Sequence, residues 1–401
     1  MSVTTPEELA RRAGTHLSVV QLCRKSSVPL RKQGGDEPRF ALALSGGGFR
    51  ASLSALGVLR FFASANLLSH VSTVSSVSGG SVTNGLFAVS YRKIEASGFT
   101  LKAFDEAVTD PLLSYITSKS MTRKLIMNSW KAIGPPTRTT ILANALDQWF
   151  YDGAKLHDLS ETCDFVINAT NLNSGVRFGF KQYSVGDYTL GFVKPRDSLL
   201  VAEAVAASAA VPGVFAPFDL KGHKYPCDVG YPPKLVDGGV YDNLGIEPIK
   251  NLESTCLVVL NAGGVFRVGK LGPLPIVGAL ARSNSVMYRQ SSALRMRDFV
   301  DRYKQWERND PPPSTGRQGV IFCLGTTFKA VAPKWLINRP NDVDPSHLEG
   351  LPTSFSRFSL DDAVRLIYRG WWLTGASLAT FHPSVISDLP AVPPMPQRTH
   401  I

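Results

Sequence analysis

The amino-acid sequence predicts a three-layer α/β/α fold around a central, mostly parallel sheet. A strand pattern over residues 39–44 leads into a helical pattern over 50–65, and a second strand pattern over 71–77 leads into another helix. A strand–helix–strand unit places its two strands parallel in one sheet, with the connecting helix packed on a face of that sheet. At 401 residues, of which 44% are hydrophobic and 19% charged, the chain can bury one large α/β core.

The chain divides by pattern into four consecutive parts. Residues 1–38 are predicted to form a helix and a basic linker, and residues 39–325 to form the main domain. Within that domain, a helical insertion over about residues 98–160 either caps a cleft or covers one face of the sheet. Residues 326–382 are expected to form a loop and a C-terminal helix packed on the domain, and the proline-rich residues 383–401 a disordered tail.

The remaining elements follow from apolar periodicity. Strands are predicted at residues 164–169, 176–183, 256–261 and 319–324, and helices at 198–210, 281–308 and 361–381. The helix over 281–308 mixes arginine and lysine with apolar side chains. Either it lies with a basic and apolar face on an anionic bilayer, or it packs on the core with its charges in water. The same two interpretations, membrane anchor or core packing, apply to Trp371 and Trp372 in the last helix.

The spacing of the cysteines and the absence of long apolar segments predict the cellular compartment of the protein. The five cysteines are odd in number, far apart and never in a C-x-x-C pair: Cys23, Cys163, Cys227, Cys256 and Cys323. This spacing predicts free thiols in a reducing compartment and no zinc site. The N-terminal residues contain no secretion-type apolar segment, and there is no apolar run of the ~18 residues that a membrane span needs. A cytoplasmic protein is therefore predicted, and peripheral contact with a membrane is compatible with it.

The net charge of +11 and pI near 9.4 favour anionic partners. A phospholipid head-group layer and a nucleic acid both carry the required charge. Because the basic residues are dispersed and no aromatic–basic recognition motif occurs, no nucleic-acid partner is expected. Nothing in the sequence indicates an oligomeric state.

The segment SVSGGS over residues 76–81 is typical of a turn that carries a nucleophilic serine. It lies between a predicted strand and a predicted helix, with Ser78 at its centre. Such a turn forces its central residue into a strained conformation that small neighbours tolerate, and it directs the hydroxyl away from the sheet into a cleft. The free N–H groups at the start of the following helix then point toward a group bound above Ser78. Ser76 stands where the G-x-S-x-G motif has its first glycine. An ordinary turn is the alternative interpretation.

Two more segments add candidate groups. Gly46, Gly47 and Gly48 join the first strand to a helix, and without Cβ atoms their amides can approach an anion or a developing oxyanion. A flexible turn or a phosphate loop is the alternative, although the spacing fits neither common nucleotide-binding glycine motif. Asp237 ends a short apolar strand and precedes two glycines, so it can approach a hydroxyl as a base; an isolated Asp-Gly pair is more often a simple turn.

Taken together, these motifs resemble those of the patatin-like phospholipases. The matching segments, in the family's order, are SGGGFRA at 45–51, VSGGS at 77–81, NATNLNSG at 168–175, ASAAVPGVFAP at 207–217 and DGG at 237–239. The first is also similar to the corresponding motif of animal cytosolic phospholipases A. The resemblance implies a patatin-like catalytic domain over residues 39–325.

The resemblance also implies a function: a lipid acyl hydrolase of the phospholipase A type that cleaves fatty-acyl esters of phospholipids through an acyl-serine intermediate. Ser78 would be the nucleophile and Asp237 the base of a Ser/Asp dyad, and the glycines at 46–48 would form the oxyanion hole. Arg50 matches the motif arginine, either stabilising the loop or binding a lipid phosphate. The substrate would be a phospholipid or a membrane surface, and no metal or organic cofactor is implied.

Two alternatives stay open at this point. A histidine-based triad would need one of the seven histidines, and His223 is the candidate because it lies in a loop shortly before Asp237. A catalytically silent lipid- or nucleotide-binding protein would use the same glycines without chemistry. Labelling of Ser78 by a fluorophosphonate distinguishes this second alternative from an enzyme.

Overall fold

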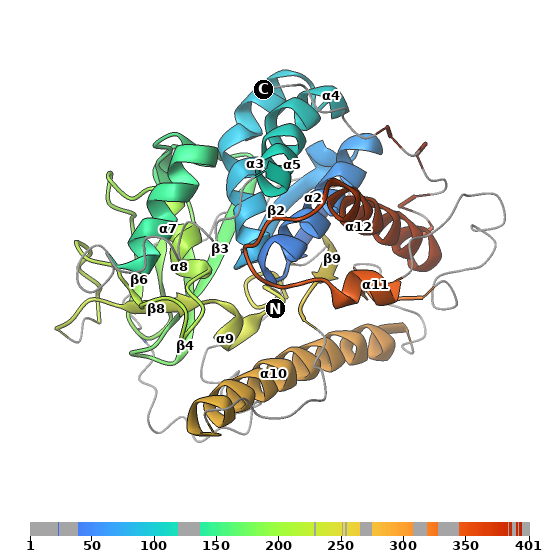
Figure 1. Cartoon of the computed structure of the whole chain (residues 1–401). Helices are drawn as coiled ribbons and strands as arrows, with labels where there is room; N and C mark the ends of the chain where they lie inside the picture. The colour runs from blue at the N-terminus through green and yellow to red at the C-terminus, as the bar shows by residue number, and fades with distance from the viewer. Residues whose placement is uncertain are drawn as a thin grey trace.

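The chain forms a mixed α/β structure, here a computed structural model (Figure 1). It describes residue 23 and residues 39–118, 137–227, 230–250, 252, 255–264, 275–307, 319–327, 345–383, 385–386, 390–391 and 393–394. The predicted N-terminal helix and basic linker lie outside the described residues, apart from Cys23. Part of the predicted loop after residue 326 and most of the predicted tail lie outside them too.

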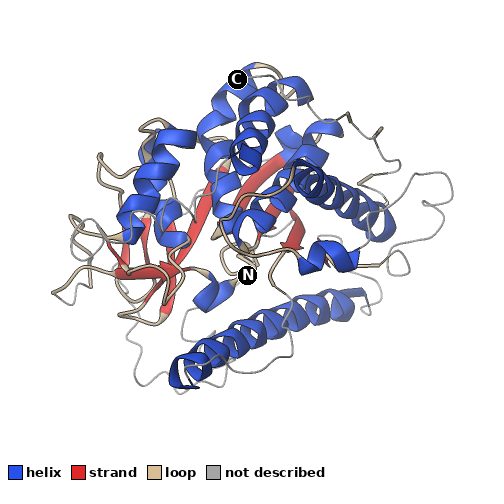
Figure 2. Cartoon of the chain, viewed as in Figure 1, coloured by secondary structure: helices blue, strands red, loops and turns tan. Residues whose placement is uncertain are grey.

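A ten-stranded sheet lies at the centre of the described structure (Figure 2). Its order is β10-β9-β1-β2-β3-β4-β5-β6, and β8 pairs with both β3 and β7. Neighbouring strands from β10 to β3 are parallel, and the other pairs are antiparallel. The strands are β1 (Arg39–Leu44), β2 (Val71–Val77), β3 (Asp164–Asn171), β4 (Val176–Phe180), β5 (Val185–Asp187), β6 (Gly191–Val193), β7 (Phe218–Asp219), β8 (Lys234–Asp237), β9 (Thr255–Asn261) and β10 (Gly319–Cys323).

The helices follow the predicted pattern with shifted ends. They are α2 (Gly48–Ser64), α3 (Gly79–Ala96), α4 (Leu101–Phe104), α5 (Asp110–Ser118), α7 (Arg138–Leu146), α8 (Val201–Ser208), α9 (Gly239–Asp242), α10 (Pro275–Glu307), α11 (Pro345–Gly350) and α12 (Leu360–Phe381). Single turns of 3-10 or π geometry are η1 (Leu68–His70), η2 (Asp105–Thr109), η4 (Asp147–Tyr151) and η5 (Leu156–Asp158).

Helices cover both faces of the parallel part of the sheet. On β1, Phe40, Leu42 and Leu44 belong to the large core that also contains side chains of α2, α3 and α12. The intervening Ala41 and Ala43 belong to a smaller cluster that includes Phe299 of α10. Because successive side chains of a strand point to opposite faces, the two clusters mark the two sides of the sheet. The predicted α/β fold with a central, mostly parallel sheet is thus confirmed.

The described parts of the predicted insertion are largely helical. They contain α4, η2, α5, α7 and η4, and their apolar side chains, such as Phe104, Val108 and Leu112, belong to the large core. This packing favours a layer that covers the sheet over a separate cap. Trp371 and Trp372 are 1% and 2% exposed in α12, so they pack in the core and do not form a membrane anchor.

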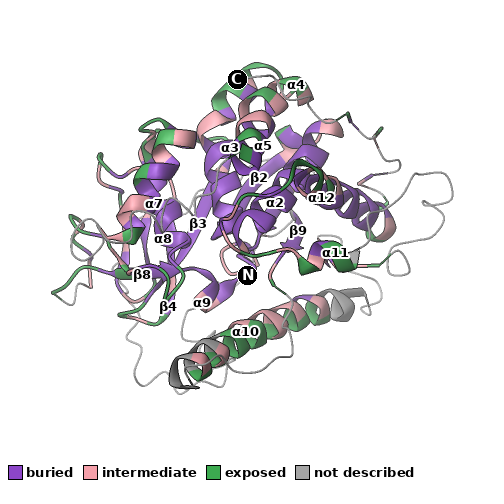
Figure 3. Cartoon of the chain, viewed as in Figure 1, coloured by how far each residue is buried: buried purple, intermediate pink, exposed green. Residues whose placement is uncertain are grey.

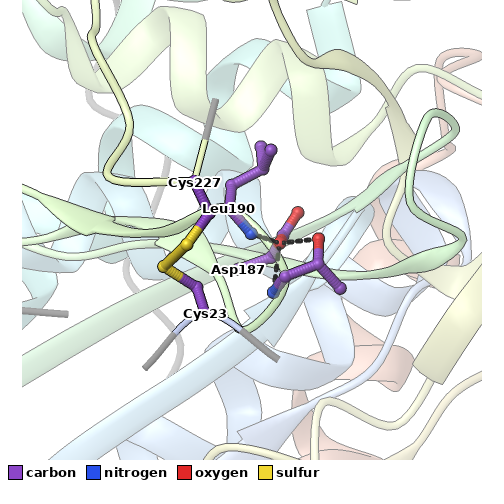
Figure 4. Close-up of a disulfide and its surroundings, with 5 residues drawn as sticks. Cys23, Asp187, Leu190 and Cys227 are labelled. Atoms are coloured by element: carbon purple, nitrogen blue, oxygen red, sulfur yellow. Dashed lines mark hydrogen bonds between the residues drawn. A yellow bond between two sulfur atoms is a disulfide. The ribbon is translucent and has the colours of Figure 1, made fainter. Parts of the chain in front are cut away.

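The cysteines correct the prediction of five free thiols. Cys23 and Cys227 form a disulfide, while Cys163, Cys256 and Cys323 are free (Figure 4). Both partners bind one turn: the Cys23 amide donates to the Tyr188 carbonyl, and the Cys227 amide donates to the Leu190 carbonyl. This pairing contradicts the prediction of five free thiols, which was one of the two observations behind the predicted reducing compartment. The spacing of the cysteines gave no sign of this disulfide, because its two cysteines are 204 positions apart in the sequence.

Asp187 organises the turn that holds this disulfide. Its carboxylate accepts hydrogen bonds from the amides of Thr189 and Leu190 and from the side chains of Asn171 and Ser174 (Figure 4 shows Asp187 beside Leu190). A buried carboxylate with this many donors is well stabilised.

As for membrane spans, none of the described helices is both long and apolar enough to cross a bilayer.

Candidate active site

Ser78 occupies a sharp turn between the end of β2 and the start of α3. Its backbone has φ 51° and ψ −118°, a positive φ that is uncommon for a residue with a side chain. The next two residues must be small, since a Cβ on Gly79 would collide with the Gly48 carbonyl and one on Gly80 with the Leu44 carbonyl. The backbone of this turn therefore packs closely against the segment that joins β1 to α2.

Ser208, the last residue of α8, connects the Ser78 turn to the Asp237 turn. The Ser78 amide donates to Ser208 Oγ over 2.9 Å, and this hydroxyl in turn donates to the Asn168 carbonyl over 2.6 Å. The Ser208 carbonyl accepts the Gly238 amide at 3.2 Å. One buried residue thus binds the backbone of both turns. Ser208 and Asn168 both lie in sequence segments that resemble the family, but the sequence alone indicated no role for either residue.

Asp237 ends β8 and lies beside Ser78, with 1% of its surface exposed. Its Oδ1 accepts the Gly239 amide at 2.8 Å. Oδ2 has no described partner of good hydrogen-bond geometry, although the Ser78 hydroxyl is near enough to affect the carboxyl. Burial raises the pKa of Asp237 from 3.8 to about 6, while the nearby Ser78 hydroxyl and the hydrogen bond from the Gly239 amide oppose that rise. A carboxylate with this pKa is a stronger base than an ordinary aspartate.

The three predicted glycines lie next to the Ser78 turn, and their amides differ. Gly47 has φ 140° and Gly48 has φ 58°, so both adopt conformations that favour glycine. The Gly46 amide already donates to the Asn243 carbonyl at 3.0 Å. The amides of Gly47 and Gly48 donate to no other described residue. Gly47 and Gly48 are therefore the two glycines of this segment whose amides have no acceptor among the described residues.

Arg50 lies in the first turn of α2 and is buried, with 1% of its surface exposed. Its guanidinium donates to the Glu349 carbonyl at 2.9 Å, the Leu351 carbonyl at 3.2 Å and the Ala262 carbonyl at 2.8 Å. These bonds connect the segment after β9 and the C-terminal end of α11 to the start of α2. The geometry favours the loop-stabilising role of Arg50 over contact with a lipid phosphate.

Tyr288 of α10 also reaches this site, and sequence reasoning missed it. Its hydroxyl donates to Asn243 Oδ1 at 2.6 Å, and a Cβ on Gly239 would collide with the Tyr288 side chain. A Cβ on Gly46 would lie 3.1 Å from Ser78 Cβ and 3.3 Å from the Tyr288 hydroxyl oxygen. No local pattern marks Tyr288, because it comes from a helix far along the chain.

His223 does not join this group. Its Nε2 accepts the Arg196 amide at 3.1 Å, and its ring lies near Tyr225. Burial lowers the pKa of this imidazole, with the Arg196 charge acting in the same direction. In the described part of the chain, no group of three or more His, Cys, Asp or Glu side chains could hold a metal ion.

The chain has a mixed α/β architecture with a sheet that is parallel from β10 to β3. Residues 42–249, about half of the chain, match the Patatin family, described as patatin-like phospholipase, and the chain belongs to that family. This confirms the resemblance found in the sequence. Arg50, Ser78 and Asp237 all lie within the matched residues, whereas Tyr288 lies beyond them.

Solved structures similar to this chain include human and bacterial proteins. A human GIVD cytosolic phospholipase A2 has 14% identity and a TM-score of 0.49, with 87% of this chain and 60% of that chain covered. The same human protein in complex with methyl gamma-linolenyl fluorophosphonate has 14% identity and a TM-score of 0.47, with 87% and 59% covered. VipD from Legionella pneumophila has 13% identity and a TM-score of 0.42, with 86% and 67% covered. Comparison with curated protein sequences gave no match.

Proposed function

We propose that this chain is a lipid acyl hydrolase of the phospholipase A type, with Ser78 as nucleophile and Asp237 as base. The observation that carries the proposal is the pairing of these two buried residues. Ser78 is held on a turn with positive φ, and the carboxyl of Asp237 beside it is made more basic by burial. Family membership supports hydrolysis of a lipid ester.

In the first half of the reaction, Asp237 takes the proton of the Ser78 hydroxyl while Oγ forms a bond to the ester carbonyl carbon. The carbonyl oxygen becomes an oxyanion, which the Gly47 and Gly48 amides stabilise. When the tetrahedral intermediate collapses, the bond to the alcohol oxygen breaks and Asp237 returns the proton to that oxygen. A lysolipid leaves, and the fatty-acyl group remains on Ser78.

In the second half, Asp237 takes a proton from water, and the resulting hydroxide attacks the acyl-Ser78 carbonyl. The intermediate collapses, Oγ of Ser78 leaves and receives the proton back from Asp237, and the fatty acid is released. A carboxylate is a modest base, so the mechanism depends on positioning and oxyanion stabilisation as well as on proton transfer. This balance suits esters better than the less reactive amides.

The substrate surface would be the head-group layer of a membrane. The chain carries a net charge of +11, and α10 exposes the apolar side chains of Val286, Met287 and Leu294 together with Arg289 and Arg297. A surface that combines apolar and basic groups is suited to an anionic bilayer. We therefore propose peripheral association with such a bilayer.

The test uses purified full-length chain, a fluorophosphonate probe and phospholipid vesicles with analysis of the lipids released. The wild-type chain is expected to be labelled at Ser78 and to release fatty acid and lysolipid. Ser78→Ala should abolish labelling and hydrolysis, and Asp237→Asn should reduce both by a factor of about 10³ or more, since both groups act in one step. A wild-type chain that is folded but never labelled would instead be a silent binding protein.

A further inference from the structure

Tyr288 lies on α10, outside the residues that match the family, and this helix brings it to the Asp237 turn. Its aromatic ring lies directly against Gly239: a Cβ built on that glycine would collide with the Tyr288 hydroxyl and with ring carbons. Gly239 is also the residue whose amide donates to Asp237 Oδ1 at 2.8 Å. The ring therefore covers the same short turn that holds the carboxylate.

The hydroxyl of Tyr288 ties this cover to the glycine segment on the other side of Ser78. It donates to Asn243 Oδ1 at 2.6 Å, and the Asn243 carbonyl accepts the Gly46 amide at 3.0 Å. A Cβ built on Gly46 would lie 3.1 Å from Ser78 Cβ and 3.3 Å from the Tyr288 hydroxyl oxygen. Tyr288 thus connects the Asp237 turn to the glycine segment at residues 46–48, beside Ser78.

The helix that carries Tyr288 is held in place by charged and polar contacts near the site. Ser291 Oγ donates to the Tyr241 carbonyl at 3.1 Å, and Arg295 pairs with Glu247 at 2.7 Å and approaches Asp242 at 3.6 Å. Farther along, Phe299 is buried in the smaller core cluster. The position of the Tyr288 ring is consequently determined by contacts on its C-terminal side in α10.

Several titratable groups are packed around the Asp237 turn. They are Ser78 on the β2–α3 turn, Tyr241 and Asp242 on α9, Glu247 after α9, Tyr288 and Arg295 on α10, and Arg177 on β4. The main influences on Asp237 itself are burial, Ser78 and the Gly239 amide. Burial also raises the pKa of Tyr288 well above its ordinary range, with Asp237 and Asp242 adding to that rise, so Tyr288 stays neutral.

We propose that Tyr288 is a positioning residue of the active site, whose ring closes the space over the turn at residues 237–239 and keeps water from the Asp237 carboxylate. It acts through Asp237: a carboxylate without water around it is a stronger base toward the Ser78 hydroxyl. The inference rests on the proposed function, because it assigns to Asp237 the role of base. It adds to the site a residue that the matched domain does not contain.

The experiment measures kcat and kcat/KM for p-nitrophenyl butyrate, a soluble ester that needs no membrane, across the acid and neutral pH range. A base must be deprotonated, so wild-type activity should rise with pH through about 6 and then level off. In Tyr288→Ala, water reaches the carboxylate and favours its charged form. The acid limb, the part of the pH profile in which activity rises with pH, should therefore shift to lower pH by about one unit or more. The plateau of kcat should fall about tenfold.

Two controls separate shielding from other effects of the substitution. Tyr288→Phe keeps the ring and should retain the wild-type acid limb. Tyr231→Ala removes a tyrosine that is 53% exposed and should leave both the limb and the plateau unchanged. If Tyr288→Ala does not fold, Tyr288→Leu opens part of the same space with a smaller loss of packing, and its limb should move in the same direction.

An acid limb in Tyr288→Ala or Tyr288→Leu that coincides with that of the wild type overturns the inference while leaving the proposed function intact. A limb displaced as far in Tyr288→Phe as in Tyr288→Ala also overturns it, because the ring would then not be what matters. A wild-type chain that neither hydrolyses the ester nor reacts with a fluorophosphonate at Ser78 overturns the proposed function, and the inference with it.

Discussion

At the scale of single residues, Ser208 shows how one buried residue can connect two turns that lie far apart in the sequence. Its hydroxyl accepts the Ser78 amide and its carbonyl accepts the Gly238 amide. The positions of both turns are therefore fixed by hydrogen bonds to the same buried residue. Because a misplacement of about 1 Å can be costly to catalysis, this arrangement would affect the rate of the proposed reaction as well as the stability of the fold.

Ser208→Ala is expected to leave the Ser78 amide buried without its acceptor, at a cost of about 1–3 kcal/mol in the free energy of unfolding. The rate of fluorophosphonate labelling at Ser78 should fall about tenfold, because the turn is no longer held in register with Asp237. Denaturant unfolding and labelling kinetics measure the two effects. Ser54→Ala is the matched control: Ser54 is also buried, but its hydroxyl donates to the Arg50 carbonyl of its own helix at 2.9 Å. Equal labelling rates in the two variants would contradict the positioning role of Ser208.

At the scale of elements, α2 is positioned by α12, which lies outside the residues matched to the family. The two helices cross at glycines: a Cβ on Gly57 would collide with the Ile367 carbonyl, and one on Gly370 with the Ser54 carbonyl. This close approach matters for the candidate site because α2 begins at Gly48, the last of the three glycines at residues 46–48. In Figure 3, both helices are largely buried where they meet.

Gly370→Ala should therefore force the two helices apart and destabilise the protein by about 1–3 kcal/mol, the usual cost of overpacking. Arg365→Ala, at a 46% exposed side chain of the same helix, should change the free energy of unfolding by no more than about 0.5 kcal/mol. Denaturant unfolding followed by circular dichroism measures both. A Gly370→Ala protein as stable as the wild type would mean that α2 and α12 can separate without cost.

At the scale of the whole molecule, charge and exposed apolar surface meet on α10, which runs along one side of the protein (Figures 1 and 3). Its inner side carries Tyr288 and Phe299, and its outer side exposes Met287 at 64% and Leu294 at 52%. One helix thus contacts the candidate active site on one side and presents apolar groups to solvent on the other. This arrangement supports the proposal that the protein approaches an anionic bilayer with this side.

Leu294→Asp is expected to weaken binding to vesicles of equimolar phosphatidylcholine and phosphatidylglycerol by about tenfold or more, since burial of a leucine contributes about 1.5–3 kcal/mol. Leu360→Asp is the matched control, because Leu360 is 41% exposed at the start of α12. Vesicle co-sedimentation measures binding, and added salt should weaken that of the wild type. Equal binding by the two variants would place the contact surface elsewhere.

Local sequence pattern was sufficient to predict most elements of the core and the individual site motifs. The turn at Ser78, the glycines at 46–48 and the Asp237 strand each depend on a few adjacent residues, because a strand-to-helix turn and an amide-lined loop are local structures. For the same reason, the parallel sheet could be inferred from alternating strand and helix patterns. The ends of helices were less predictable, as α10 begins at Pro275 rather than at residue 281.

The sequence by itself determined the family, the α/β fold and the residues that can carry chemistry, since each leaves a signal among neighbours in the chain. The tertiary structure alone decided which of these residues meet. Long-range contacts such as Ser208 with Ser78, Tyr288 with Gly239 and Cys23 with Cys227 join segments far apart in sequence. They arise from packing in three dimensions, which produces no periodicity or spacing along the chain. The raised pKa of Asp237 has the same origin, because burial is a property of the folded molecule.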